Sequence, residues 1–197
     1  MRVLRPVFAA GLLGLLASPA LAQDRYATID VRGGYTFNSG VAGDSLKGQS
    51  SFGAGAFIAL GNRLHLGVTA DWAHHSQKQA DGSVIGGLDD EQWNVIHAFL
   101  KVSFDLAHTD KVTFALNAGP GLMIFSPNQV LRDSRGTKTD GHFAVNAGAT
   151  GTYWFADRIG VIASFQADIA LKKTSGQIFT DGSAMMFPVT GGFVFKL

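Results

Sequence analysis

The chain is built from eight stretches in which apolar residues alternate with small or polar residues at every second position. Successive side chains of a β-strand point to opposite faces, so this alternation predicts strands with two different faces. The stretches lie at about 26–37, 50–60, 64–76, 92–106, 111–125, 141–155, 159–172 and 184–197. No helix-period segment and no domain linker interrupts them, so we expect a single all-β domain.

The connections between these stretches alternate in length. Short connections lie at 61–63, 107–110 and 156–158. Long connections lie at 38–49, 77–91, 126–140 and 173–183. The short ones contain Gly, Asn or Asp, which suit tight turns between antiparallel strands. Short turns at one end and long loops at the other predict four hairpins joined into an up-and-down meander of eight antiparallel strands.

The two rows of each stretch differ in chemistry. In the seventh stretch one row is Ile159, Val161, Ala163, Phe165, Ala167, Ile169 and Leu171. The opposite row is Gly160, Ile162, Ser164, Gln166, Asp168, Ala170 and Lys172. An apolar outer row and a small, polar inner row are typical of a transmembrane β-barrel, whereas a soluble ligand-binding barrel has the reverse pattern. The stretches are long enough, because a tilted strand crosses the hydrocarbon layer in about 9–11 residues.

Aromatic residues of the apolar row are sorted by height. Near the short turns this row contains Phe104, Phe114, Tyr153, Phe155, Phe193 and Phe195. Near the long loops it contains Tyr35, Phe37, Phe52, Trp72, Phe143 and Phe187. Two aromatic girdles that flank an aliphatic band are expected where rings lie at the two membrane–water boundaries. The sorting therefore favours a barrel surrounded by lipid.

Residues 1–22 have the pattern of a secretory signal peptide. Arg2 and Arg5 precede a short apolar stretch at 7–17, and the segment ends in Ala20-Leu21-Ala22. A basic start, a short apolar middle and a small-residue ending are the signals for export and cleavage. We expect cleavage after Ala22, with residues 23–197 forming the barrel domain.

Composition excludes several other classes. The chain is 46% hydrophobic and 16% charged, yet beyond residue 22 no run approaches the 18 apolar residues of a membrane helix. It has no cysteine, which excludes disulfides, thiolate zinc sites and thiol catalysis. Without Arg2 and Arg5 it carries 14 basic and 15 acidic residues, so there is no electrostatic case for nucleic-acid binding.

Together these features resemble the small eight-stranded outer-membrane β-barrel proteins of Gram-negative bacteria, the OmpA/OmpX-like superfamily. The most specific element is the segment 191–197, in which Phe193 and Phe195 alternate outward and Leu197 ends the chain. The resemblance implies that Phe193, Phe195 and Leu197 form the assembly signal that the barrel-insertion machinery reads. It implies a monomer in the bacterial outer membrane with periplasmic termini. Nothing follows residue 197, so we expect no peptidoglycan-binding domain such as some relatives carry.

The inner row collects charged residues. They are Asp30, Arg32, Asp71, Lys101, Asp105, Asp168, Lys172 and Lys196. Eight strands enclose little more than side chains, and buried charges require partners, so we expect ion pairs across an occluded polar lumen. A narrow pore remains an alternative. So does a lateral route for small hydrophobic solutes, because Pro120 and Pro188 lie inside strands and predict bulges or local irregularity in the wall.

Two groups of residues raise the question of catalysis or metal binding. His74 and Ser76 lie two apart on the outward row, where some outer-membrane lipid A esterases and acyltransferases have a His and a Ser. A hydroxyl nucleophile needs a base and usually an orienting carboxylate, and no acidic residue is clearly placed on the neighbouring outward face. We therefore expect no enzyme, with a lipid A hydrolase or transferase as an alternative. His65, His97 and His142 point inward at different heights, so we expect no metal site and no cofactor.

The long loops carry basic residues that are candidates for contact with lipopolysaccharide phosphates. These are Lys47, Lys78, Arg132, Arg135, Lys138 and Lys173. Arginine in particular suits bidentate phosphate binding. The sequence thus predicts a structural or surface-interaction role in the outer membrane, with lipid, lipopolysaccharide and the assembly machinery as partners.

Overall fold

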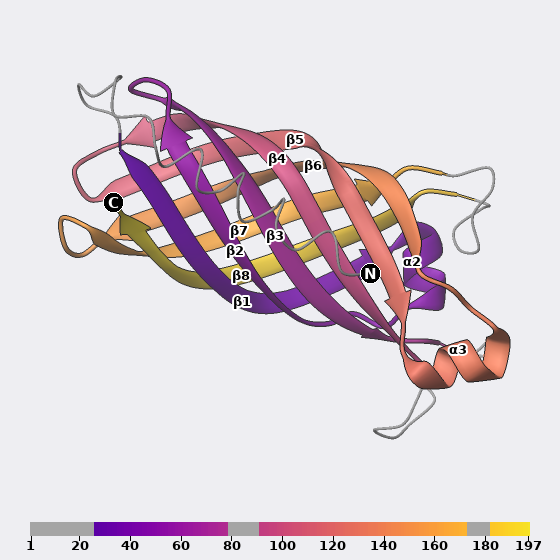
Figure 1. The fold of residues 1–197 in the computed structure, drawn as a ribbon. Coiled ribbons are helices and arrows are strands. Elements are labelled where there is room, and N and C mark those ends of the chain that lie inside the picture. The colour runs from indigo at the N-terminus through magenta and orange to yellow at the C-terminus, as the bar shows by residue number, and fades with distance from the viewer. Residues whose placement is uncertain (1–25, 79–90, 173–181) are drawn as a thin grey trace, which may run out of the picture.

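The chain folds into one closed barrel (Figure 1). This computed structural model describes residues 26–78, 91–172 and 182–197. The strands are β1 (Ala27–Ser39), β2 (Gln49–Ala59), β3 (Leu64–Ser76), β4 (Gln92–His108), β5 (Val112–Pro127), β6 (Asp140–Trp154), β7 (Ile159–Ala170) and β8 (Ala184–Lys196). Each strand pairs antiparallel with its neighbours in sequence, and β1 pairs with β8 to close the ring. This confirms the predicted all-β, eight-stranded, antiparallel up-and-down barrel.

The strand boundaries agree with the alternation pattern to within about two residues. The stretch predicted at 26–37 is β1 at Ala27–Ser39, and the one predicted at 159–172 is β7 at Ile159–Ala170. The three short connections and the C-terminus lie at one end of the barrel, and the long connections lie at the other (Figure 1). The expected signal peptide, residues 1–22, and the loop residue Lys173 lie outside the described residues.

Two short helices in the long connections were not predicted. They are α2 (Gly40–Ser45) and α3 (Gln129–Arg135). The start of α3 is capped by Asn128, whose side chain accepts a hydrogen bond from the Leu131 backbone, and its end by Gly136 in the left-handed conformation. Asn and Gly eight residues apart are a recognisable cap pair, but the apolar period between them is too short to be read as a helix. In the described residues no helix is long and apolar enough to span a membrane.

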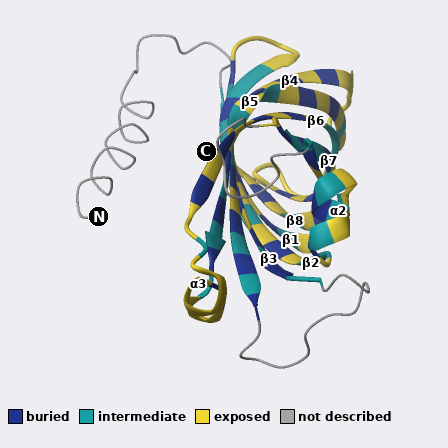
Figure 2. Cartoon of the chain, turned by 90° about the vertical axis from the view of Figure 1, so that its right-hand side faces the viewer, coloured by how far each residue is buried: buried dark blue, intermediate teal, exposed yellow. Residues whose placement is uncertain are grey.

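Burial alternates residue by residue along the strands (Figure 2). The outward side chains of the wall are apolar and exposed. Leu100, at the middle of β4, has an exposed fraction of 50%. Of the twelve aromatic residues predicted for the girdles, all but Phe187 are exposed large hydrophobics, and Phe187 stacks on exposed Phe165. The wall therefore presents a continuous apolar belt outward.

Pro120 and Pro188 interrupt the hydrogen-bonded ladder without a bulge. Pro120 keeps its pairing with Val145 on β6, whereas the ladder between β4 and β5 has a gap beside it. Pro188 keeps its pairing with Thr36 on β1, and the ladder between β7 and β8 has the corresponding gap. The register is the same on both sides of each gap. The expected irregularity is present, but bulges there were a wrong prediction, because a missing N–H removes a bond toward one neighbour only.

Glycine on the inner face of β2 makes room for charged neighbours. Gly53 pairs with Arg32 on β1 and with Asp71 on β3, so it lies between two long charged side chains. A Cβ added to Gly53 would lie 1.8 Å from the Asp71 carboxylate oxygen Oδ1. Gly55 has the same relation to Asp30, whose Oδ2 would be 2.5 Å from an added Cβ. On this side of the narrow interior, the long charged side chains of β1 and β3 are thus accommodated by glycines on β2.

We expect Gly53→Ala to lower the free energy of unfolding by about 1–3 kcal/mol, because the methyl group overpacks the lumen against Asp71. Gly151→Ala is the matched control, since an added Cβ at Gly151 meets no atom within 4 Å. Urea unfolding of the two variants and the wild type in lipid vesicles measures the difference. Equal stability of the two variants would contradict the packing role given to Gly53.

Candidate functional site: the barrel lumen

A cavity of about 90 Å³ occupies the half of the lumen nearest the short turns. Its polar wall includes Asp30, Arg32, Lys101 and Asn117, and its apolar wall includes Trp154. At the short-turn end Tyr26 and Thr28 are only partly buried, whereas Trp154 and Val194 are buried. The cavity is large enough for several water molecules by the usual volume per buried water. Solvent therefore reaches the interior from the short-turn side.

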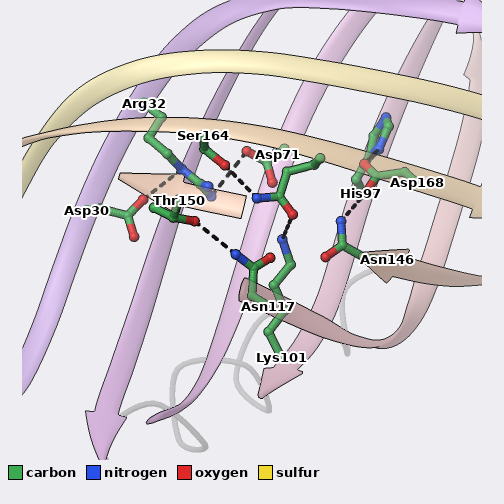
Figure 3. Close-up of polar contacts among 11 residues, drawn as sticks. Asp30, Arg32, Asp71, His97, Lys101, Asn117, Asn146, Thr150, Ser164 and Asp168 are labelled. Carbon is green, nitrogen blue, oxygen red and sulfur yellow. Dashed lines mark hydrogen bonds and ion pairs between the residues drawn. The ribbon is translucent and has the colours of Figure 1, made fainter. Parts of the chain in front are cut away.

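Above this cavity, Arg32 joins two carboxylates. Its Nε lies 2.7 Å from Asp30 Oδ1 on the same strand, and one terminal nitrogen lies 3.4 Å from Asp71 Oδ1 on β3 (Figure 3). All three side chains are largely buried. Glycine at position 53 lets Arg32 reach across β2 to Asp71. One guanidinium thus serves two carboxylates, and the group carries one net negative charge.

Two further contacts cross the lumen from β4 to β7 (Figure 3). His97 Nδ1 lies 2.6 Å from Asp168 Oδ2, and Asn146 donates a hydrogen bond to the other carboxylate oxygen of Asp168. Lys101 Nζ donates to Gln166 Oε1 at 3.2 Å, and the ammonium lies 5.6 Å from the centre of the Phe99 ring. These contacts and the Arg32 group form what we call the lumen network. Its members are Asp30, Arg32, Asp71, His97, Lys101, Asn146, Gln166 and Asp168.

The lumen network contains five of the eight charged residues that the sequence assigns to the inner row, and some of them have other partners than expected. Lys101 is 2% exposed, and no described carboxylate lies within ion-pair distance of its ammonium. Its closest polar partner is the neutral Gln166. His97, expected only to point inward, forms the contact with Asp168. Partners across a barrel depend on strand tilt and register, which a single sequence does not contain.

The other three of these eight charged residues are Asp105, Lys196 and Lys172, and of these Asp105 lies near the mouth of the cavity. Its Oδ2 is 3.2 Å from His65 Nε2 and 3.5 Å from His108 Nδ1. At the same end Lys196 lies over the Trp154 ring, with Nζ 4.1 Å from the centroid. Lys172, also assigned to the inner row, is exposed just beyond β7. The charged residues are therefore spread along the height of the lumen.

At the long-loop end much of the lumen is filled by an apolar cluster, which corrects the expectation of a polar occluded interior there. The residues there are at most 4% exposed, and we call them the apolar seal. Its members are Ala42, Leu46, Trp93, Val95, Phe99, Met123, Phe125, Leu131, Ala144, Ala170, Ala184 and Met186. The alternation pattern could have indicated it, because both rows of β4 are apolar near Val95 and Ile96.

The wall stays closed beside the prolines. A Cβ added to Gly119 would lie 1.8 Å from the Leu100 carbonyl oxygen, and one added to Gly121 would lie 2.1 Å from that of Ala98. Strands β4 and β5 are thus in close contact on both sides of Pro120. The pairing shifts register between Asp105 and Ala107 instead, near the short turns. This geometry gives no support to a lateral route at Pro120.

The pair His74 and Ser76, predicted on the outward row, does not form a catalytic arrangement, and Ser76 is buried. His74 Nδ1 lies 3.2 Å from the Asn94 side-chain oxygen, and Ser76 Oγ accepts a hydrogen bond from Gln49 at 2.6 Å. Each residue thus has its own partner on a neighbouring strand, and neither partner is a carboxylate. Among the described residues, no group of three or more His, Asp or Glu side chains could hold a metal ion.

The basic residues of the long loops mostly bind other parts of the loops. Arg135 forms an ion pair with Glu91, at 2.6 Å between its terminal nitrogen and Oε2. Arg132 donates to the Pro127 carbonyl at 3.0 Å, and Lys78 donates to the Gly43 carbonyl. Lys47 and Lys138 have exposed side chains. At the C-terminus, Phe193, Phe195 and Leu197 all point outward and are exposed.

Comparison with known proteins identifies the fold but no family. No family model matches the sequence, and no curated protein sequence matches it. A major outer membrane protein from Thermus thermophilus is 11% identical, with a TM-score of 0.59 over 89% of this chain and 100% of the other. Neisserial surface protein A is 12% identical, with a TM-score of 0.58 over 89% and 98%. OprG from Pseudomonas aeruginosa is 10% identical, with a TM-score of 0.50 over 88% and 97%. The chain therefore has the fold of small outer-membrane β-barrels.

We expect Arg32→Met to lower the free energy of unfolding by about 3–5 kcal/mol, because it leaves Asp30 and Asp71 buried without their cation. Arg158→Met, in the exposed turn before β7, is the control and should change stability by less than about 0.5 kcal/mol. Urea unfolding in vesicles compares the two. Adding Asp71→Asn to Arg32→Met should recover part of the loss, and failure to do so would contradict the charge argument.

Proposed function

We propose that this protein is an integral outer-membrane β-barrel without enzymatic activity, which anchors a surface-exposed set of loops in the cell envelope. The observation that carries the proposal is the closed wall with an apolar, exposed outer face between two aromatic girdles. In water such a belt would be a severe aggregation hazard, whereas in a membrane it is solvated by lipid. Closure of the ring supports the same conclusion, because an unpaired strand edge is not tolerated in hydrocarbon.

The interior supports an anchoring role over open transport. The lumen network and the apolar seal fill the middle and the long-loop end of the barrel. An eight-stranded barrel of this kind has no continuous aqueous channel at rest. The long-loop end is also where the chain adds structure beyond the wall, including α3, which carries exposed charged residues and is fixed by Glu91.

The partners follow from this placement. We propose that the short turns face the periplasm and the long loops face outward, where exposed Lys47, Arg132 and Lys138 could meet lipopolysaccharide phosphates. The outward Phe193, Phe195 and Leu197 would serve as the assembly signal for the insertion machinery. The expected signal peptide, residues 1–22, would direct export. Fractionation with the outer membrane and removal of residues 1–22 from the mature protein test these assignments.

Arginine substitutions at two heights of the same strand test the membrane assignment. We expect Leu100→Arg, at the middle of β4, to destabilise the barrel by about 2–4 kcal/mol, because it places a charge in the hydrocarbon core. Leu106→Arg, near the short turns, should cost only about 0–1 kcal/mol, because the side chain reaches the interface. Both leucines are about half exposed, so a water-soluble barrel would tolerate both changes equally. Unfolding in vesicles measures the difference, and equal small effects would reject the proposal.

A further inference from the structure

The apolar seal is made by three different parts of the chain. Strands β4 to β8 contribute inward apolar residues, such as Val95, Met123 and Met186, and α3 contributes Leu131. Strands β1 to β3 contribute none to this cluster, and their buried apolar residue near this end is the small Ala73. The remaining sector is covered by α2 and the residue after it, through Ala42 and Leu46, which are 0% and 2% exposed. Most contacts of α2 are with β8 and β1. Without this segment, the seal would be open along one side.

The wall behind this segment is polar. The inward residues of β1, β2 and β3 at the long-loop end include Thr36, Ser51 and His75, each at most 1% exposed. Thr36 Oγ1, Ser51 Oγ and His75 Nε2 have no hydrogen-bond partner within the described part of the chain. A buried polar atom without a partner costs about 1–3 kcal/mol relative to a hydrated one. Water could satisfy all three if the segment moved aside.

The segment is held mainly by hydrogen bonds. Asn38 donates to the Leu46 carbonyl at 3.2 Å, and His75 Nδ1 lies 3.0 Å from the Lys47 carbonyl oxygen. Helix α2 has only six residues and no side-chain N-cap. A helix this short is not stable on its own, so its position depends on these contacts. The strands around it are held by the ladders of the closed ring, which are interrupted only beside the prolines, and are far more stable.

From these observations we propose that residues 40–46 are a displaceable plug, and that moving them opens an aqueous path along β1 to β3 that conducts small cations. The path would join the lower cavity, which already reaches Lys101 and Arg32, to the long-loop side. Polar side chains of the lumen network can exchange hydrogen bonds with water, whereas apolar side chains exclude water. The apolar seal is therefore the barrier to the passage of water and ions.

The charge along the path sets its selectivity. The carboxylates of Asp30, Asp71, Asp105 and Asp168 face the lumen. Three cationic side chains face it, namely Arg32, Lys101 and, at the mouth, Lys196, which is one fewer than the four carboxylates. Among the Asp, Lys and Arg side chains of the described lumen there is thus one more carboxylate than cation, and this excess favours cations over anions.

Single-channel recording in planar bilayers tests the plug through a removable cross-link. Leu46 and Gln77 form an isolated antiparallel bridge, and the backbone bonds on both sides identify it as a non-hydrogen-bonded pair. Such pairs have Cα atoms about 4.5 Å apart, which suits a disulfide. The chain has no cysteine of its own, so Leu46→Cys/Gln77→Cys can form only this bond within one molecule. The single variants Leu46→Cys and Gln77→Cys are the matched controls.

We expect the wild type to open rarely. Reduced Leu46→Cys/Gln77→Cys and Leu46→Cys alone should open at least about tenfold more often, because a buried leucine contact of the closed state is lost. Oxidation should silence only the double variant, and reductant should restore its openings. Replacing residues 40–45 with Gly-Gly-Ser-Gly-Gly-Ser should give the longest openings, with a cation-selective reversal potential in a KCl gradient.

Equal activity of the oxidised and reduced double variant would overturn the proposal. So would a silent Gly-Ser variant that retains the heat-dependent electrophoretic migration of a folded barrel, and an anion-selective reversal potential would overturn the cation path. If the Gly-Ser variant fails to fold, the disulfide variants still decide. The inference rests on the proposed membrane location, which Leu100→Arg and outer-membrane fractionation test separately, so a silent but correctly inserted barrel would reject only the plug.

Discussion

Pairing of β1 with β8 is the interaction on which the rest of the molecule depends. It extends from Thr28 to Ser39 and turns a sheet with two open edges into a ring. In hydrocarbon each unpaired backbone group costs several kcal/mol, so an open sheet with this outer surface would have no stable location. Closure also fixes the number of strands and thereby the width of the interior. The outer and inner surfaces therefore follow from one constraint.

The narrow interior explains which residues stand next to one another inside. Charged side chains on β1 and β3 lie on either side of glycines on β2, because no volume remains for a third side chain. Contacts such as His97 with Asp168 then cross the lumen and tie opposite walls together. Polar groups in the middle and apolar groups at the long-loop end fill the barrel by different means. The packing in the middle depends on hydrogen bonds, whereas the packing at the long-loop end depends on the exclusion of water.

The fold could be predicted from the sequence because its signal is local. Alternation in a stretch such as 159–172 identifies a strand and its lipid-facing row without reference to any other strand. The partner of Lys101 could not be predicted, since it depends on the register and tilt of β4 and β7 together. The apolar seal was missed for a related reason. Residues such as Trp93 and Phe125 are inward by parity, but they belong to one buried cluster with Leu46 and Ala42, which lie in a connection that the alternation pattern treats as a loop.

The cavity and the seal lie at opposite ends of the same lumen, which makes the interior one-sided. The cavity lies toward the short turns, and apolar side chains fill the other end of the lumen. Asp105 and His65 line this cavity on the short-turn side. In the proposed membrane location, the lumen would face the solution at the short turns, and the long loops would face the solution on the opposite side. In that location, a single 20.8 kDa chain would expose one set of residues to each of the two solutions.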